Sequence, residues 1–197
     1  MLKKIMPDFY FHTRLAAHEQ LKNNLFPQAL AHCRPTKEWN CEVQTTRESG
    51  EIDYSGFLTE LKGVVSTLCD SIGTRCPLEF RIESLWMNVY NVGNWQELHH
   101  HASPNNNLSF CYFMNLNPQT DAHFFFQNER SANYSAAGLH QVFNLVENLE
   151  IAESTFLQVA EGDIILFPSH LRHGVSLQRA NSNRCTLSGN LLVLSQT

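Results

Sequence analysis

The chain has 197 residues, 43% of them hydrophobic and 11% aromatic, which suits one globular domain with a substantial buried core. The formal net charge of -5 and a pI near 6.0 argue against nucleic-acid binding, because a phosphate backbone requires a basic surface. No apolar window approaches the roughly 20 residues of a membrane span, and the first ten residues lack the order of a signal peptide. We therefore expect a cytoplasmic protein that contacts neither nucleic acid nor a membrane and keeps its six cysteines as free thiols.

The first eighty residues have a helical pattern. Apolar residues recur at near-helical spacing from Leu15 to Leu30, and more regularly from Tyr54 to Cys69 in a run that should end near Gly73. We expect residues 1–80 to form an N-terminal helical extension that packs on the remainder of a single structural domain.

From about residue 81 the pattern changes to short strands separated by turn sequences such as Gly93-Asn94 and Glu161-Gly162. Eight segments are rich in β-branched, aromatic or leucine residues: Ser84–Val92, Gln96–His101, Leu108–Asn115, Ala122–Asn128, Thr155–Ala160, Asp163–Phe167, His173–Leu177 and Arg184–Leu194. Residues 81–197 therefore predict a mainly β fold of the jelly-roll type, a cupin-like double-stranded β-helix capped by the N-terminal helices. An open sandwich fits the same pattern almost as well.

A histidine pair in the second of these strands is the first candidate for chemistry. Alternate side chains of a strand share a face, so His99 and His101 point together while His100 points away. Two imidazoles two residues apart on one face can bind the same metal ion. An exposed histidine-rich edge without a metal is the simpler interpretation of this motif taken alone.

A third histidine follows a buried strand and a Pro-Ser break in the segment from Glu161 to Val175. His173 stands at the start of the next strand, beside Gly174, whereas His170 lies in the loop after Pro168. We therefore favour His173 as the third metal ligand and keep His170 as the competing candidate.

The last strand alternates strictly. Arg184, Thr186, Ser188 and Asn190 share one face, and Cys185, Leu187 and Leu191 share the other. A polar face of this kind usually meets water. If it lines the interior of a barrel instead, Arg184 becomes a clamp for a carboxylate, because its planar guanidinium matches a carboxylate with two parallel hydrogen bonds.

The order of these motifs resembles the iron(II)/2-oxoglutarate-dependent oxygenase superfamily, in particular a branch of oxygenases from marine bacteria and their phages with an HxH…H motif. The resemblance covers a little over half of the chain, from Trp86 to Leu192. It is carried by Trp86-Met87-Asn88-Val89, Leu98-His99-His100-His101, Tyr112, Glu161-Gly162-Asp163, Leu166-Phe167-Pro168-Ser169, His173-Gly174-Val175, Arg184 and Asn190.

The resemblance implies an iron(II) site at the open end of the β-helix. His99 and His173 would be the two histidine ligands, and His101 would stand where the superfamily usually has a carboxylate. The cofactors implied are therefore iron(II) and 2-oxoglutarate, the latter as cosubstrate.

The resemblance also implies a cosubstrate site. Arg184 would bind the distal carboxylate of 2-oxoglutarate with help from Tyr112. Three asparagines, Asn88, Asn115 and Asn190, would line the same cavity. Three residues depart from the branch pattern, namely Ala102 in place of proline, Phe110 in place of glycine and His170 in place of tryptophan.

The expected activity is that of a dioxygenase that hydroxylates a small molecule or a peptide. Two alternatives stay open: a three-histidine cupin-type dioxygenase that uses no 2-oxoglutarate, and a non-catalytic metal-binding jelly-roll module. Nearby, Phe124, Phe125 and Phe126 read as a core strand that could also wall the cavity, and His123 as a surface residue. The sequence is compatible with a homodimer but contains no signal for one.

Overall fold

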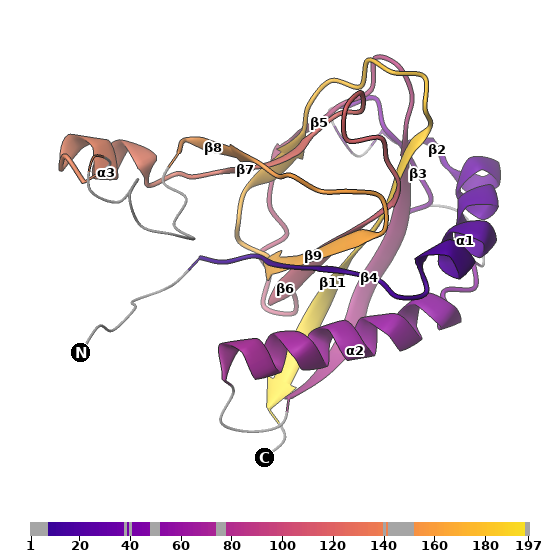
Figure 1. The fold of residues 1–197 in the computed structure, drawn as a ribbon, viewed down its shortest axis with the longest axis horizontal. Helices are drawn as coiled ribbons and strands as arrows, with labels where there is room; N and C mark the ends of the chain where they lie inside the picture. Colours follow the sequence, from indigo (N-terminus) through magenta and orange to yellow (C-terminus); the bar gives the residue numbers. More distant parts are fainter. Residues whose placement is uncertain are drawn as a thin grey trace.

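A computed structural model describes residues 8–37, 39, 41–47, 52–73, 78–139, 141 and 152–195. Two antiparallel sheets face each other, and two helices cover the outer face of the larger sheet (Figure 1). The helices are α1 (His18–His32), α2 (Ser55–Ile72) and the short α3 (Ser131–Ala136). The strands are β1 (Phe11–Arg14), β2 (Arg34–Pro35), β3 (Gln44–Thr45), β4 (Leu78–Tyr90), β5 (Gln96–His99), β6 (Leu108–Asn115), β7 (Phe124–Gln127), β8 (Ser154–Phe156), β9 (Asp163–Pro168), β10 (His173–Val175) and β11 (Arg184–Ser195).

The strand order confirms the double-stranded β-helix and rules out the open sandwich. Within the described residues, the small sheet has the order β5-β10-β7-β8, and the large sheet contains the run β9-β6-β11-β4. From β4 to β11 the chain alternates between the two sheets, except that β7 and β8 both lie in the small sheet, as in a jelly roll. The structure contains the expected strands, but their ends differ. For example, β4 begins at Leu78 rather than Ser84, and β5 ends at His99 rather than His101.

Helix α2 shows why the N-terminal pattern is helical. Its buried residues are Phe57, Leu61, Val64, Val65 and Leu68, a spacing that places one apolar stripe against the sheet. The helix ends at Gly73, whose φ of 67° is the left-handed conformation that glycine adopts most easily. No helix in the described part of the chain is long and apolar enough to cross a membrane.

The N-terminal residues also contribute strands. β1 pairs with β9 at one edge of the large sheet, and β3 pairs with β4 at the other, followed by β2. The part before residue 80 is therefore joined to the β-helix by backbone hydrogen bonds as well as by helix packing. The expected boundary at residue 80 falls inside β4.

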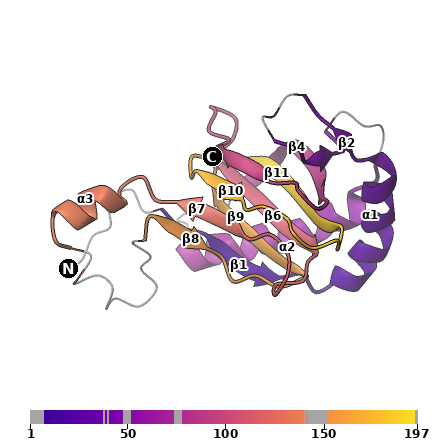
Figure 2. The same ribbon diagram turned by 90° about the horizontal axis from the view of Figure 1, so that it is seen from above.

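Each face of the large sheet has its own core. One core contains the buried faces of α1 and α2 together with Met87, Tyr112 and Leu187 of the sheet. The other lies between the sheets and contains Phe113 and Phe124. Helix α3 lies away from both sheets (Figure 2). Alternation along β4, β6 and β11 thus decides which side chains face the helices and which face the space between the sheets.

The five described cysteines have no disulfide partner in the described part of the chain, and Cys76 lies outside it. They are Cys33, Cys41, Cys69, Cys111 and Cys185.

Candidate metal centre and adjoining pocket

Three histidines, one each from β5 and β10 and one from just after the end of β5, meet at one end of the space between the sheets. β5 and β10 pair with His99 directly opposite His173, and His101 follows two residues after His99. The ring centroids lie 4.4 Å apart for His99 and His173, 4.8 Å for His99 and His101, and 5.2 Å for His101 and His173. One nitrogen from each ring lies within 4.8 Å of the other two, which is close enough to hold one metal ion.

Backbone carbonyls set the orientation of two of these rings. Nδ1 of His99 donates a hydrogen bond to the carbonyl of Glu97 at 2.8 Å, and Nδ1 of His173 donates to the carbonyl of Leu171 at 2.9 Å. Because a carbonyl can only accept, the proton of each ring is on Nδ1 and the lone pair is on Nε2. This arrangement is typical of histidine metal ligands, whose second nitrogen is fixed by an outer partner.

Burial keeps all three imidazoles neutral. It is the largest cause that lowers the pKa of His99, lowers that of His101 to about 3, and lowers that of His173 well below its usual range. The neighbouring histidines reinforce the effect, since each would repel a proton on another. At neutral pH the cluster therefore presents unprotonated nitrogens, the form that binds metal.

The competing histidine lies outside the cluster. His170 is exposed, and its Nε2 lies 2.9 Å from Oδ1 of Asp8. The neighbouring His100 is exposed as well, as strand alternation predicts, and so is His123. Among the candidates, the structure thus brings together His99, His101 and His173.

A buried arginine stands in the same pocket without a partner. Arg184 begins β11 and has no solvent exposure, and its guanidinium lies 4.6 Å from the ring centre of Tyr90 and 5.9 Å from that of Phe113. In the part of the chain that the structure describes, none of its three side-chain nitrogens has a hydrogen-bond partner. A buried cation without a counter-ion is costly, so this geometry indicates a site for an anionic ligand.

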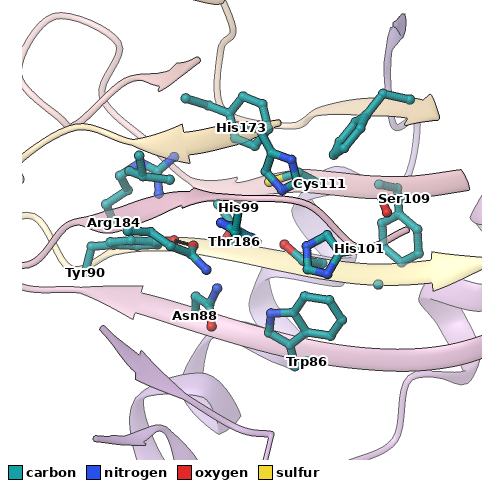
Figure 3. A pocket seen from close by; sticks show the side chains of 17 residues that line it. Trp86, Asn88, Tyr90, His99, His101, Ser109, Cys111, His173, Arg184 and Thr186 are labelled. Atoms are coloured by element: carbon teal, nitrogen blue, oxygen red, sulfur yellow. Dashed lines mark hydrogen bonds between the residues drawn. The ribbon is translucent and has the colours of Figure 1, made fainter. Parts of the chain in front are cut away.

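The pocket between Arg184 and the histidines holds about 380 Å³ with its open mouth included. Arg184 lies against Tyr90 on one side, and His101 and Trp86 lie on the other (Figure 3). Asn88 stands between Trp86 and Tyr90 on β4 and is 2% exposed. Within the described residues, the side-chain oxygen of Asn88 and the indole nitrogen of Trp86 also lack partners. Asn88 therefore lines the cavity, as the resemblance implied.

Tyr112 does not line the pocket, so its predicted role beside Arg184 is wrong. Alternation along β6 turns Tyr112 toward the helices, where its hydroxyl lies 2.7 Å from Nδ1 of His18 and its ring stacks on Phe57. The aromatic residue beside Arg184 is Tyr90, whose hydroxyl donates to Oε1 of Gln96 at 2.7 Å. The sequence contained a signal for it, because Asn88 and Tyr90 are two residues apart in one strand.

Asn190 also lies outside the pocket lining. Its side-chain oxygen accepts a hydrogen bond from Ser109, and its amide nitrogen donates to Ser84, each at 2.8 Å. Both amide atoms are therefore engaged in bonds across the large sheet, next to a β-bulge that follows Asn190. Asn190 is not among the residues that line the pocket, and its contact with the cosubstrate stays a prediction. Asn115 is engaged likewise, since its amide donates to the carbonyls of Ser182 and Asn183.

Phenylalanines wall the histidine side of the pocket. Phe124 stacks on His173 with ring centres 5.3 Å apart and an interplanar angle of 16°, and Phe167 meets the same imidazole edge-on at 4.9 Å. Phe125 points to the outer face of the small sheet and contacts Phe156. Only Phe124 of the run from 124 to 126 lines the pocket, while Phe126 completes the core between the sheets.

Phe110 stands where the branch usually has glycine, and the neighbouring strand leaves room for it. Phe110 pairs with Gly189 on β11, and a Cβ atom at Gly189 would lie 2.7 Å from the Phe110 ring. The glycine on the neighbouring strand therefore provides the space that the larger side chain requires.

Comparisons with solved structures agree with this fold. Solved structures of similar fold include a prolyl-4-hydroxylase from Pseudomonas putida (11% identity, 94% of this chain and 92% of that chain, TM-score 0.59). They also include an oxidoreductase of the 2OG-Fe(II) oxygenase family from Burkholderia pseudomallei (14% identity, 93% and 85%, TM-score 0.61). A viral collagen prolyl hydroxylase from Paramecium bursaria Chlorella virus-1, solved as a 2OG complex, is a third (9% identity, 93% and 95%, TM-score 0.55). At these identities the likeness concerns the fold.

No curated protein matches the sequence significantly. The model of the family described as "Putative 2OG-Fe(II) oxygenase" matches residues 84–190, which is more than half of the chain and includes all three histidines and Arg184. The chain therefore belongs to the 2OG-Fe(II) oxygenase family, an oxidoreductase family whose cofactors are iron(II) and 2-oxoglutarate.

Proposed function

We propose that this protein is an iron(II)- and 2-oxoglutarate-dependent dioxygenase that hydroxylates a small molecule or a peptide in the cytoplasm. The observation that carries the proposal is Arg184, a fully buried guanidinium without a partner among the described residues, in the same pocket as three neutral histidines. A metal site alone would not explain the cation. A cosubstrate with a metal-chelating end and a distant carboxylate accounts for both features.

The histidine cluster fits iron(II). His99 and His173 would bind through Nε2, because their Nδ1 protons are held by backbone carbonyls. His101 would be the third ligand in place of the usual carboxylate, which leaves the site one charge unit more positive. Three protein ligands leave positions for the cosubstrate and oxygen.

The rest of the pocket fits 2-oxoglutarate. Arg184 would bind its distal carboxylate with two charge-assisted hydrogen bonds, and the Tyr90 ring keeps the guanidinium plane in place. Asn88 and Trp86 supply further unpartnered polar atoms to the lining of the same pocket.

When bound, iron and 2-oxoglutarate supply the oxidation of a substrate C–H bond by molecular oxygen, with 2-oxoglutarate converted to succinate and carbon dioxide. The chain's own residues would position the cosubstrate and exclude water from the pocket. The histidines would hold the metal that binds one end of the cosubstrate, Arg184 would hold the other end, and the Phe124 and Phe167 rings would keep water from the histidine side.

The test is anaerobic reconstitution of the protein with iron(II), followed by 2-oxoglutarate. We expect a visible absorption band from the chelated keto acid, and succinate after oxygen is admitted. Iron binding without the band and without succinate would favour a three-histidine dioxygenase that uses no 2-oxoglutarate. Absence of iron binding would leave a binding module and refute the proposal.

A further inference from the structure

A second arginine, Arg47, lies at the edge of the pocket and plays no part in the site described above. Its guanidinium lies 5.2 Å from the ring centre of Trp86 and 5.7 Å from that of Trp39. Trp86 lines the pocket, and the centre of its ring lies 5.5 Å from that of His101. Arg47 and a candidate metal ligand thus pack against the same indole.

The fold positions Arg47 through backbone pairing. Thr45 pairs with Asn88, and the next residue, Thr46, exchanges hydrogen bonds with Met87: its N–H donates to the Met87 carbonyl at 3.0 Å, and its hydroxyl accepts from the Met87 N–H at 2.8 Å. Continuation of this register brings Arg47 opposite Trp86. Residues opposite each other in an antiparallel pair project to the same side of the sheet, so Arg47 projects to the side on which Trp86 enters the pocket.

The charge of Arg47 has no acidic partner in the described part of the chain. By contrast, Arg81 pairs with Glu83 at 2.6 Å, and Arg172 pairs with Glu129 at 3.1 Å. Arg47 is exposed, and its guanidinium packs on the same Trp86 indole that lies beside His101. A guanidinium packed on aromatic faces keeps its N–H edge available for an anion.

We propose that Arg47 binds an anionic group of the primary substrate, a carboxylate or a phosphate, at the mouth of the pocket. This inference rests on the proposed function and adds the substrate class. The anion would bind at the Arg47 side of Trp86, and the carbon to be hydroxylated would reach past that indole toward the histidines. Arg184 is fully buried and would serve the cosubstrate, so the two arginines would receive two different anions.

Binding of small probes tests this inference. Protein loaded with iron(II) and saturated with 2-oxoglutarate under nitrogen is titrated with phenylacetate, phenyl phosphate and the neutral phenylacetamide, and tryptophan fluorescence reports binding because Trp39 and Trp86 flank Arg47. The variants are Arg47→Gln and Arg47→Lys. Arg81→Gln is the matched control, since it removes another exposed arginine that is already paired.

We expect at least one anionic probe to bind about tenfold more tightly than the amide, the scale of a charge-assisted hydrogen bond. Arg47→Gln should remove this preference, Arg47→Lys should retain part of it, and Arg81→Gln should leave it unchanged. The tighter of the two anions identifies the group as carboxylate or phosphate.

Equal binding of all three probes, or an anion preference that survives Arg47→Gln, would overturn the inference. The absorption band of the 2-oxoglutarate chelate in the unaltered protein is read from the same samples. Its absence refutes the proposed function, whereas its presence without an Arg47-dependent preference refutes the substrate class alone.

Discussion

The two faces of the large sheet both bury polar side chains, but only the pocket face leaves some of them without a partner in the described residues. On the helix side, the Tyr112 hydroxyl lies 2.7 Å from His18, and Glu161 lies 3.3 Å from the same imidazole and 2.7 Å from Lys22. On the pocket side, Arg184 and Asn88 have polar atoms without partners in the described residues.

This contrast separates structure from function. A buried polar network with all partners present holds elements together, and here it fastens α1 to the β-helix. A buried polar group without a partner lowers stability, so its retention points to a ligand that completes it. Substitutions on the two faces should therefore have opposite consequences for stability and for ligand binding.

Loss of a candidate metal ligand should have the largest effect. His99→Ala should lower the affinity for iron(II) by more than about 100-fold, because even outer contacts of a metal ligand are worth about 10- to 100-fold. Iron content after anaerobic reconstitution measures this, with the exposed His100→Ala as control. Equal iron content in the two variants would remove His99 from the proposed metal site.

Arg184→Met should separate cosubstrate binding from stability. We expect the Kd for 2-oxoglutarate to rise by about 30-fold or more, which corresponds to the ~2 kcal/mol of a buried charge pair. Iron binding should persist, and the free energy of unfolding of the ligand-free protein should stay equal or rise, since an unpaired buried charge has been removed.

Titration of 2-oxoglutarate and urea unfolding measure these quantities, with the half-exposed Arg172→Met as a control. A loss of stability in ligand-free Arg184→Met would mean that the arginine is structural, and the contrast between the faces would fail.

Tyr112→Phe should show the reverse behaviour. It leaves Nδ1 of buried His18 without its partner, and we expect unfolding to become easier by about 1 kcal/mol. The affinity for 2-oxoglutarate should not change, because Tyr112 faces the helices. If Tyr112→Phe weakened the binding of 2-oxoglutarate without changing stability, the role beside Arg184 that the resemblance implied for Tyr112 would be restored.

The smallest effect concerns the pH dependence of stability. Burial would raise the pKa of Glu161, but hydrogen bonds from Lys22, from the Leu116 N–H and from His18 outweigh it and lower that pKa below its usual 4.5. The folded protein thus holds the carboxylate more firmly ionised than the unfolded chain does. Its contribution is present above about pH 4.5 and is lost as the pH falls through the lower folded value.

Glu161→Gln should therefore lower stability at neutral pH and make its decline below pH 4.5 shallower. Urea unfolding at a series of pH values measures this, with the exposed Glu19→Gln as control. Parallel pH profiles for unaltered and Glu161→Gln protein would contradict the assignment.

Local pattern was sufficient for much of the fold and for part of the site. The period-two alternation predicted that His99 and His101 share a face, and the helical stripe of Phe57, Leu61 and Val65 predicted α2. The strand start at Gly174-Val175 was enough to favour His173 over His170, which lies in the loop after Pro168. These features depend on neighbours in sequence, so periodicity and turn chemistry suffice to predict them.

Tertiary structure alone decided which face of each strand became the interior. Alternation along β6 places Tyr112 and Phe113 on opposite faces but does not say which face meets the helices. Because of this ambiguity, Tyr112 was expected in the pocket and Tyr90 was not. The β-bulge after Asn190 and the pairing of Thr45 with Asn88, which brings Arg47 opposite Trp86, arise from contacts between strands far apart in the chain. The sequence by itself thus determined the types of residue available for a metal and an anion. The register between distant strands determined which of them share one pocket, because only pairing across the sheet brings side chains from separate segments to the same face.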